Sequence, residues 1–579
     1  MAETLVSPGV LTRENDQSFI TQQPVQVGAA LVGPTVKGPV EVPTLVTSYS
    51  DYQNRFGTTF ESGSLVYSYF TSIAAYNYFA NGGNTMLVTR VVSGSAATDW
   101  SYSNAQIPAI DASTAVTFEA IDKGAVWNNN GTILTGGALE NGNIDNVRWQ
   151  VVSNNTASGV FSLVVRRGDD TTNNPVILES WNNLSLDPTQ PNFVSRVIGD
   201  TTYNYNSTEN YLEVSGSYPN SSRYIKVKTV NNLTPNYLDN AGNAKAAYVD
   251  LIPAVGSGSA GGAFSGGTGT NISTYTAGGN YYELAGTGAG AVTQGVVGSD
   301  YTDMLNLLAN QDDYAFNVLL TPGLFNSVHA SQTTTAINNT QGRGDSIYVL
   351  DPITYAATIV NTTTQAASRN TSYAAMYWPW LQTIDPDSGQ NVWVPASTMI
   401  GGVYAYNDSV SEPWFAPAGI NRGGLDNVIR PERKLTQSNR DTLYENNVNP
   451  IASFPGTGTV VYGQKTLQRQ ASALDRVNVR RLLIALKGYI GQVSQNLVFE
   501  QNTAATRNNF LAAVNPYLES VQQRQGLYAF KVVMDDSNNT PDVIDRNQMV
   551  GAIYLQPTKT AEFIILDFNV LPTGATFPG

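Results

Sequence analysis

Residues 561–570, AEFIILDFNV, are the most strand-like stretch of this 579-residue chain. Alternate positions along the stretch build one wholly apolar face: Ile564, Leu566, Phe568 and Val570. The pattern stops at 571–574, LPTG, where proline removes a hydrogen-bond donor and glycine favours a turn. We expect a strand this apolar to join a sheet, either in its own subunit or in a neighbouring one.

The composition indicates a large folded protein with an uncharged polar surface. At about 150 residues per domain, 579 residues predict about four domains. Hydrophobic residues make up 41% of the chain, but charged residues only 13%, and interface cores are depleted in charge. The composition therefore suits a protein with extensive protein–protein contacts, and it suits a secreted or β-rich surface protein equally well.

Net charge and residue usage disfavour several classes of partner. The formal charge of −14 argues against nucleic-acid binding, which needs clustered Lys and Arg. The absence of cysteine excludes disulfides and thiolate chemistry. The first residues, MAETLVSPGV, lack the features of a signal peptide, and no stretch approaches eighteen apolar residues. We expect neither secretion by such a signal nor direct insertion into a membrane.

The first hundred residues suggest an α/β layer preceded by an arm. Residues 1–20 carry a few apolar side chains, Leu5, Val6, Val10 and Leu11, too few to form a core. Short apolar runs with Gly-Pro punctuation follow from residue 25 and predict strands and turns. A helix is expected from about Ser64, a possible cap, to Phe79, and a strand over 85–92.

The middle of the chain changes character twice. From 96 to 235, short alternating segments bounded by turn residues predict a mainly β region without a convincing helix. Residues 256–298 are rich in Gly and Ser, which favours a long loop or linker. From residue 300 a helix, a strand, a helix near 324–338 and a second strand repeat the earlier α/β rhythm. The β region is therefore predicted to interrupt one discontinuous domain.

The last 120 residues predict a compact α+β unit. Residues 477–498 place their apolar side chains on one narrow helical face. Arg476, Arg480 and Lys487 form a basic stripe beside that face; it is either a solvated flank or a partner contact. A second helix is expected over roughly 503–522, followed by two strands, a helical turn between them, and the strand at 561–570.

The predicted fold class is multidomain, mixed α/β and α+β. The parts are an arm at 1–20, a discontinuous α/β core at 21–95 and 236–455, a mainly β insertion at 96–235, and an α+β domain at 456–579 with an arm at 561–579.

Residues that usually carry chemistry are sparse. His329 is the single histidine, and neither a G-x-S-x-G elbow nor a zinc ligand set accompanies it. The G-x-G-x-x-G match at 256–261 lies inside the glycine-rich tract, away from any strand-to-helix turn. Residues 343–345, Arg-Gly-Asp, are better explained by a tight turn than by cell adhesion. No catalytic, cofactor-binding or metal-binding residue is predicted, and an enzyme is disfavoured.

Motifs along nearly the whole chain, taken in order, resemble the tail sheath proteins of contractile-tailed bacteriophages and of related contractile injection systems. They include Ser7-Pro8-Gly9-Val10, Lys37-Gly38-Pro39, Asn81-Gly82-Gly83, Leu350-Asp351-Pro352, Tyr377-Trp378-Pro379-Trp380, Gly401-Gly402-Val403-Tyr404, Ala416-Pro417-Ala418-Gly419 and Val479-Arg480-Arg481. The Gly- and Ser-rich tract departs from the family, which usually has a tighter glycine turn there.

The resemblance implies a non-enzymatic structural subunit of the virion, assembled in the host cytoplasm. It would polymerise helically around an inner tail tube and contract, driving the tube through the host envelope for genome ejection. Its implied partners are further copies of itself, the tail tube protein, and the baseplate and tail terminator proteins; no cofactor is implied.

The resemblance also implies what the two arms and the basic stripe do. The arm residues Leu5, Val6, Val10, Leu11, Ile564, Leu566, Phe568 and Val570 would exchange strands between subunits. The domain at 456–579 would face the tube, with Arg476, Arg480 and Lys487 as the candidate contact.

Two alternatives remain open at this point. One is the sheath of a phage-tail-like bacteriocin or injection device. The other is a surface or receptor-binding module that acts through the β insertion.

Overall fold

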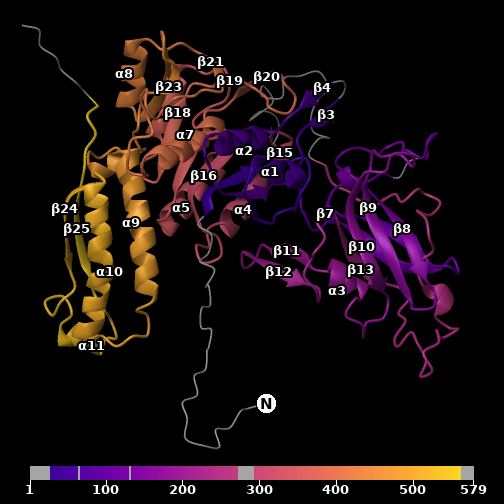
Figure 1. Ribbon diagram of the computed structural model, residues 1–579. Coiled ribbons are helices and arrows are strands. Elements are labelled where there is room, and N and C mark those ends of the chain that lie inside the picture. Colours follow the sequence, from indigo (N-terminus) through magenta and orange to yellow (C-terminus); the bar gives the residue numbers. More distant parts are fainter. Residues whose placement is uncertain (1–26, 63–64, 130–131, 271–291, 563–579) are drawn as a thin grey trace, which may run out of the picture.

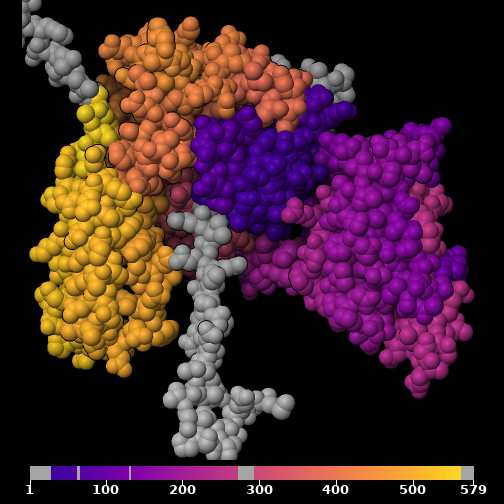
Figure 2. All heavy atoms as spheres, viewed as in Figure 1, coloured from indigo at the N-terminus to yellow at the C-terminus, as the bar shows by residue number. Residues whose placement is uncertain are grey.

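A computed structural model describes residues 27–62, 65–129, 132–270 and 292–562. Three lobes are visible in Figures 1 and 2: a central sheet with helices on it, a β-rich lobe on one side, and a lobe of long helices and two strands on the other. We refer to them as the α/β body, the β unit and the C-terminal unit.

The α/β body is built on one eight-stranded sheet. Its strands, in order across the sheet, are β2 (Thr44–Val46), β5 (Met86–Arg90), β1 (Val27–Gly33), β16 (Phe316–Phe325), β17 (Ile347–Asp351), β18 (Ala374–Trp378), β22 (Val448–Phe454) and β23 (Gly458–Val461). The six central strands are parallel, and β2 and β23 run antiparallel at the edges. β1 pairs with both β5 and β16. The segment before residue 95 and the segment after residue 300 therefore contribute strands to a single sheet.

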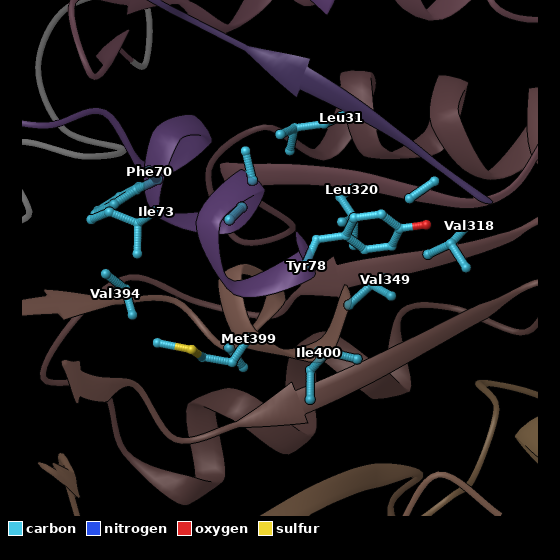
Figure 3. Close-up of a cluster of buried hydrophobic side chains, with 14 of the residues drawn as sticks. Leu31, Phe70, Ile73, Tyr78, Val318, Leu320, Val349, Val394, Met399 and Ile400 are labelled. Carbon is cyan, nitrogen blue, oxygen red and sulfur yellow. The ribbon is translucent and has the colours of Figure 1, made fainter. Parts of the chain in front are cut away.

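Both faces of this sheet are covered by helices. The helices are α1 (Tyr49–Phe56), α2 (Phe70–Ala80) and α7 (Ser397–Val410) on one face, and α4 (Tyr301–Leu307), α5 (Ala330–Arg343), α6 (Ile359–Ala367) and α8 (Gln437–Glu445) on the other. Alternate strand residues serve the two faces: Leu31 packs toward α2 and α7, as Figure 3 shows, and Val32 packs toward the opposite cluster. Double coverage explains why β17 and β18 are buried along their whole length and, apart from Asp351 at the end of β17, consist of apolar and aromatic residues.

Helix α2 begins later than predicted. The helix expected from Ser64 starts at Phe70, and the residues before it form the hairpin of β3 (Phe60–Ser62) and β4 (Leu65–Tyr67). The N–H of Phe70 donates to the side-chain oxygen of Gln294, 2.7 Å away, so the first turn is satisfied by a residue distant in sequence. Ser64, the predicted cap, lies outside the described residues, and the first turn of the helix at Phe70 is satisfied by a tertiary contact.

The β unit consists of two three-stranded antiparallel sheets around their own core. The elements are β6 (Tyr102–Pro108), β7 (Thr114–Lys123) and β13 (Ile225–Val230) in one sheet, β8 (Val147–Asn155), β9 (Val160–Arg167) and β10 (Ile177–Ser185) in the other, and the short helix α3 (Val194–Ile198). Apart from α3 and one 3-10 turn, the regular elements described within residues 96–235 are therefore β-strands.

The Gly- and Ser-rich tract is in part a packed component of the β unit. Gly256 pairs with Val151, Ser265 pairs with Asn104, and Phe264 is buried in the core between the sheets. Residues 256–270 form a loop of turns and isolated bridges, and glycine allows the backbone of this loop to lie directly against the sheets, as at Gly262 against Trp149. Residues 271–291 lie outside the described part.

A hairpin of β11 (Thr202–Asn206) and β12 (Tyr211–Ser215) extends from the β unit to the α/β body. Its side chains Tyr205 and Leu212 pack against the core on the α4 face of the central sheet. Arg90 at the end of β5 makes a second connection, since its guanidinium lies 5.0 Å from the ring centre of Trp100. These contacts fix the β unit beside the body.

The C-terminal unit packs two long helices on a two-stranded antiparallel sheet. Its elements are α9 (Val477–Gln495), α10 (Ala504–Gln523), β24 (Leu527–Val533), α11 (Pro541–Asp545) and β25 (Ala552–Pro557). Smaller elements complete the chain: β14 (Val292–Thr293), β15 (Val296–Val297), β19 (Leu381–Ile384), β20 (Asn391–Val394), β21 (Val428–Pro431), and 3-10 turns at Ala125–Trp127, Val249–Leu251, Gly298–Asp300 and Ala473–Asp475.

Asp351, at the end of β17, is expected to make stability fall as pH rises. Burial raises the pKa of this carboxyl from its ordinary 3.8 to about 7, although hydrogen bonds from Ser397 oppose the rise. Between these pH values the folded chain binds more protons than the unfolded chain, so the free energy of unfolding decreases as pH increases.

Replacing Asp351 by Asn should therefore reduce the loss of stability between pH 5 and pH 8 by about 1 kcal/mol or more, since one pKa unit corresponds to about that amount. Urea unfolding of both proteins at the two pH values measures the difference, because the other buried carboxyls are present in both. Equal losses in the two proteins would contradict the assignment.

Candidate assembly interface

The sheet of the C-terminal unit has one covered and one open face. Phe530 and Val532 of β24, with Ile553 and Leu555 of β25, pack against the core formed with α9 and α10. On the other face, Tyr528 and Tyr554 are exposed beside Lys531 and Gln556. Lys531 alternates with Phe530 and Val532 by the two-residue period of a strand, and the register irregularity between Leu527 and Ala529 turns Tyr528 to the outer face. The outward surface is mixed polar and aromatic.

The edges of this sheet are open as well. Each of β24 and β25 pairs only with the other among the described residues, so each has one row of backbone groups without a strand partner there. A two-stranded sheet is marginal by itself, and an unpaired edge is a template for a further strand. The unit is therefore suited to accept additional strands.

The described chain ends at Glu562, which is held firmly. Its two carboxylate oxygens accept from the guanidinium of Arg476 at 2.7 and 2.9 Å, and the hydroxyl of Tyr444 and the amide of Gln464 also donate to it. Burial acts to raise its pKa, but these hydrogen bonds outweigh burial and lower it, so Glu562 is charged. The ion pair holds the last described residue against the start of α9.

Ala561 and Glu562 themselves are not part of a strand, although the strand was predicted to start at 561. The four predicted exchange residues beyond them, and Leu5, Val6, Val10 and Leu11 of the first arm, lie outside the described residues. Their role stays a prediction. The sequence analysis did not single out Glu562. The feature that could have identified it is that a carboxylate stands at the start of an otherwise largely apolar stretch.

The three members of the basic stripe differ in accessibility. Arg476 is engaged by Glu562, and Arg480 is buried, donating to Ser372 with its guanidinium 4.0 Å from the ring centre of Tyr373. Lys487 is exposed at the end of the stripe, where its ammonium lies 3.3 Å from the Tyr373 hydroxyl. Two of the three side chains thus attach α9 to neighbouring parts of the subunit, and Lys487 is the one that remains accessible.

The Arg-Gly-Asp sequence forms the end of α5. Gly344 adopts the left-handed conformation that terminates the helix, and Arg343 donates to the carbonyls of Leu308 and Tyr314 while pairing with Asp345 at 2.9 Å. The arginine is buried, so the tight turn predicted here is confirmed.

His329 also has a structural position. It is buried at the start of α5, and its Nδ1 accepts the N–H of Phe325 at 3.0 Å. Among the described residues, no cluster of three His, Asp or Glu side chains has the spacing of a metal site. Nor does the described part contain a helix with the length and apolarity needed to cross a bilayer.

Two family models match consecutive parts of the second half of the chain. Residues 294–467 match the model of the phage tail sheath protein central domain, and residues 469–571 match that of the phage tail sheath C-terminal domain. The second half of this chain is thus similar to the phage tail sheath family. The two sheath domains meet between β23 and α9, where the eight-stranded sheet ends and the C-terminal unit begins.

Individual sheath proteins are similar to part of the chain. It is 40% identical over 246 residues to the tail sheath protein of Vibrio phage KVP40, covering 42% of this chain and 36% of that protein. It is also 40% identical over 234 residues to the tail sheath protein of Enterobacteria phage T4, covering 39% and 36%. The aligned part thus spans just over a third of the length of these relatives.

A solved sheath structure shares the fold more widely. The sheath tail protein of Listeria innocua aligns with 92% of this chain and 96% of its own, at a TM-score of 0.52 and 11% identity. At that identity the likeness concerns the fold alone, which is a mixed α/β multidomain one as predicted.

Proposed function

We propose that this protein is the structural subunit of a contractile tail sheath. The observation that carries the proposal is the two-stranded sheet of β24 and β25, whose edges are open in the described part of a unit that matches the sheath C-terminal domain. Strands supplied by neighbouring copies would complete this sheet. The subunit would then polymerise helically around an inner tail tube.

Strand addition explains how such a polymer holds together. Backbone hydrogen bonds along β24 or β25 provide adhesion, while pockets for alternate side chains set the register. The alternating apolar residues Ile564, Leu566, Phe568 and Val570 suit the inner face of such a sheet, with residues 1–20 as the second donor. Head-to-tail exchange does not close on itself, so it generates a helical filament.

Contraction would follow from rigid subunits joined by extended connections. We infer that the subunits rotate about the exchanged strands and pack more tightly, driving the tube through the host envelope for genome ejection. Energy would be stored in the assembly, without catalysis or a cofactor. The tube, baseplate and tail terminator proteins are the expected partners, in a virion assembled in the host cytoplasm.

Expression of the full chain alone tests the proposal. Tubular assemblies visible by negative-stain electron microscopy are the expected result. A protein that remains monomeric at high concentration in the ultracentrifuge would overturn it.

Lys487 is the side chain through which the predicted tube contact can be tested. Charge reversal, Lys487→Glu, is expected to weaken co-assembly with purified tube protein about tenfold if several ion pairs are affected. Reversal of Arg480 is unsuitable, since that buried side chain packs on Tyr373 and its loss would disturb the fold.

The matched control for this test is Arg223→Glu, a change of the same charge at an exposed residue just before β13 in the β unit. Co-assembly, measured by sedimentation of sheath on tubes, should be unchanged in the control. Normal sedimentation of the Lys487 variant would remove α9 from the tube interface.

A further inference from the structure

The free end of the C-terminal unit contains an open apolar cavity of about 920 Å³. It lies between the end of α9, the loop that follows, and the segment around α11. Its apolar lining comes from Ile490, Leu497, Phe510, Met534, Ile544 and Ile553. Nothing among the described residues fills it, although its size is that of sites which bind several side chains or a small ligand.

The mouth of the cavity is held open by the backbone. Phe499 has a left-handed conformation, with φ of 70°, and its ring is fully exposed at the rim. The amide of Asn502 donates to Asn539 and to the carbonyl of Gln548, which ties the two walls together. An exposed aromatic ring beside a preformed apolar cavity is typical of a contact surface.

The surroundings of the cavity are acidic. Residues 496–502 and 534–551, here called the tip, contain five carboxylates and one arginine, a formal charge of −4. Asp536 pairs with Arg507, and Asp542 pairs with Arg546. The other three carboxylates, Glu500, Asp535 and Asp545, form no ion pair with the described residues. An occupant should therefore combine an apolar anchor with positive charge.

This requirement disfavours several occupants from the same chain. Residues 1–26 carry three carboxylates and one arginine, and residues 563–579 carry one carboxylate and no cation. A second tip would bring two charges of −4 together. Both arms and a tip-to-tip contact are electrostatically unfavourable.

One exposed segment has the required chemistry. Ile429 of β21 is 48% exposed and is flanked by three exposed cations, Arg430, Arg433 and Lys434. None of the three forms an ion pair with a carboxylate of the described chain. We call these four residues the basic edge, since β21 is an outer strand of the sheet β20-β19-β21.

The acid within this segment does not cancel its charge. Burial raises the pKa of Glu432 to about 7, so that carboxyl is partly neutral near physiological pH. The basic edge is thus an apolar side chain surrounded by positive charge in a protein whose net charge is −14.

The two complementary surfaces lie at opposite ends of the subunit. In Figure 1, β21 is at one end of the molecule, and α11, which forms part of the tip, is at the other. We infer that the tip of one copy receives the basic edge of the next, with Ile429 entering the cavity and the cations facing Glu500 and Asp545. A contact between different surfaces of identical copies propagates without closing. The inference rests on the proposed function, and it assigns a second adhesive contact to the polymer, separate from strand exchange.

Cysteine cross-linking tests the contact directly, because the chain has no cysteine of its own. Copies carrying Ile429→Cys are mixed with copies carrying Ile544→Cys and treated with a short bis-maleimide. A covalent dimer of one copy of each is expected. The matched control replaces the first variant by Val360→Cys, whose side chain on α6 is 72% exposed, and should give no such dimer.

Charge exchange provides the second measurement. Reversal of the basic edge, Arg433→Glu with Lys434→Glu, should lower the cross-linked yield about tenfold, because attraction becomes repulsion. Reversal of the tip, Glu500→Lys with Asp545→Lys, should do the same. Mixing copies with the reversed edge and copies with the reversed tip should restore the yield.

The outcomes separate this inference from the proposed function. If tubes form but no cross-link appears, or if the charge variants assemble normally, the contact is wrong and the sheath proposal stands. If the cross-link appears and no tubes form, the contact stands and the sheath proposal fails. If the tip variant loses its binding to tube protein and nothing else, the cavity belongs to the tube interface and the inference is overturned.

Discussion

Removal of residues 561–579 is expected to leave a folded subunit that cannot build a tube. The deletion takes away the alternating apolar residues of the C-terminal arm together with Glu562. The core of the C-terminal unit is formed by α9, α10, β24 and β25 and does not depend on them. Thermal unfolding should therefore change by a few degrees at most, whereas electron microscopy should show no tubes at concentrations where the unaltered protein assembles.

Two shorter deletions separate the strand from its anchor. Removing residues 575–579 keeps the whole predicted strand and the predicted turn at 571–574, and should leave assembly intact. Removing residues 563–579 keeps the ion pair of Glu562 with Arg476 but should still prevent assembly. Normal tubes from this second deletion would contradict the role of the C-terminal arm.

The second large effect is expected at Asp170 in the β unit. Its carboxylate accepts from Arg166 at 2.7 and 2.9 Å and from Arg148 at 3.2 Å, and all three side chains are almost fully buried. Asp170→Asn removes the only negative charge of this group and leaves two buried guanidinium groups uncompensated. The expected cost is about 3–5 kcal/mol in the stability of the β unit.

The neighbouring residue provides the control for this prediction. Asp169 forms an ion pair with Arg167 in which both side chains are partly exposed, so Asp169→Asn should cost about 1 kcal/mol or less. Hydrogen exchange followed by mass spectrometry measures the two variants on β8, β9 and β10 separately from the rest of the chain. Similar exchange in both variants would show that burial does not distinguish the pairs.

The long helices could be predicted from sequence because local information determines them. The apolar face of 477–498 places α9 at Val477–Gln495, and the Thr503 side chain caps α10 by accepting the N–H of Thr506. The alternating runs of the β unit also became strands. Helices α9 and α10, and strands β8, β9 and β10, contact partners close by in sequence, whereas β13 pairs with β7, more than a hundred residues earlier.

Features that depend on distant contacts could not be predicted. Helix α2 begins at Phe70, whose N–H donates to the side chain of Gln294. The glycine-rich residues 256–270 pack on strands that precede them by more than a hundred residues. The basic stripe shows the same limit for the candidate site. Periodicity placed Arg480 beside the apolar face, but its burial depends on Ser372 and Tyr373, which belong to the α/β body.

The position of β1 between β5 and β16 affects how the chain folds during synthesis. More than two hundred residues separate β5 from β16, and at about 5–20 residues per second they take on the order of tens of seconds to emerge from the ribosome. During that time β1 has one of its two neighbours, while the whole of the β unit, including β13 and residues 256–270, is synthesised before β16. We therefore expect the β unit to fold first and the central sheet to close after it, with the nascent apolar strands β1 and β5 in need of chaperone protection meanwhile.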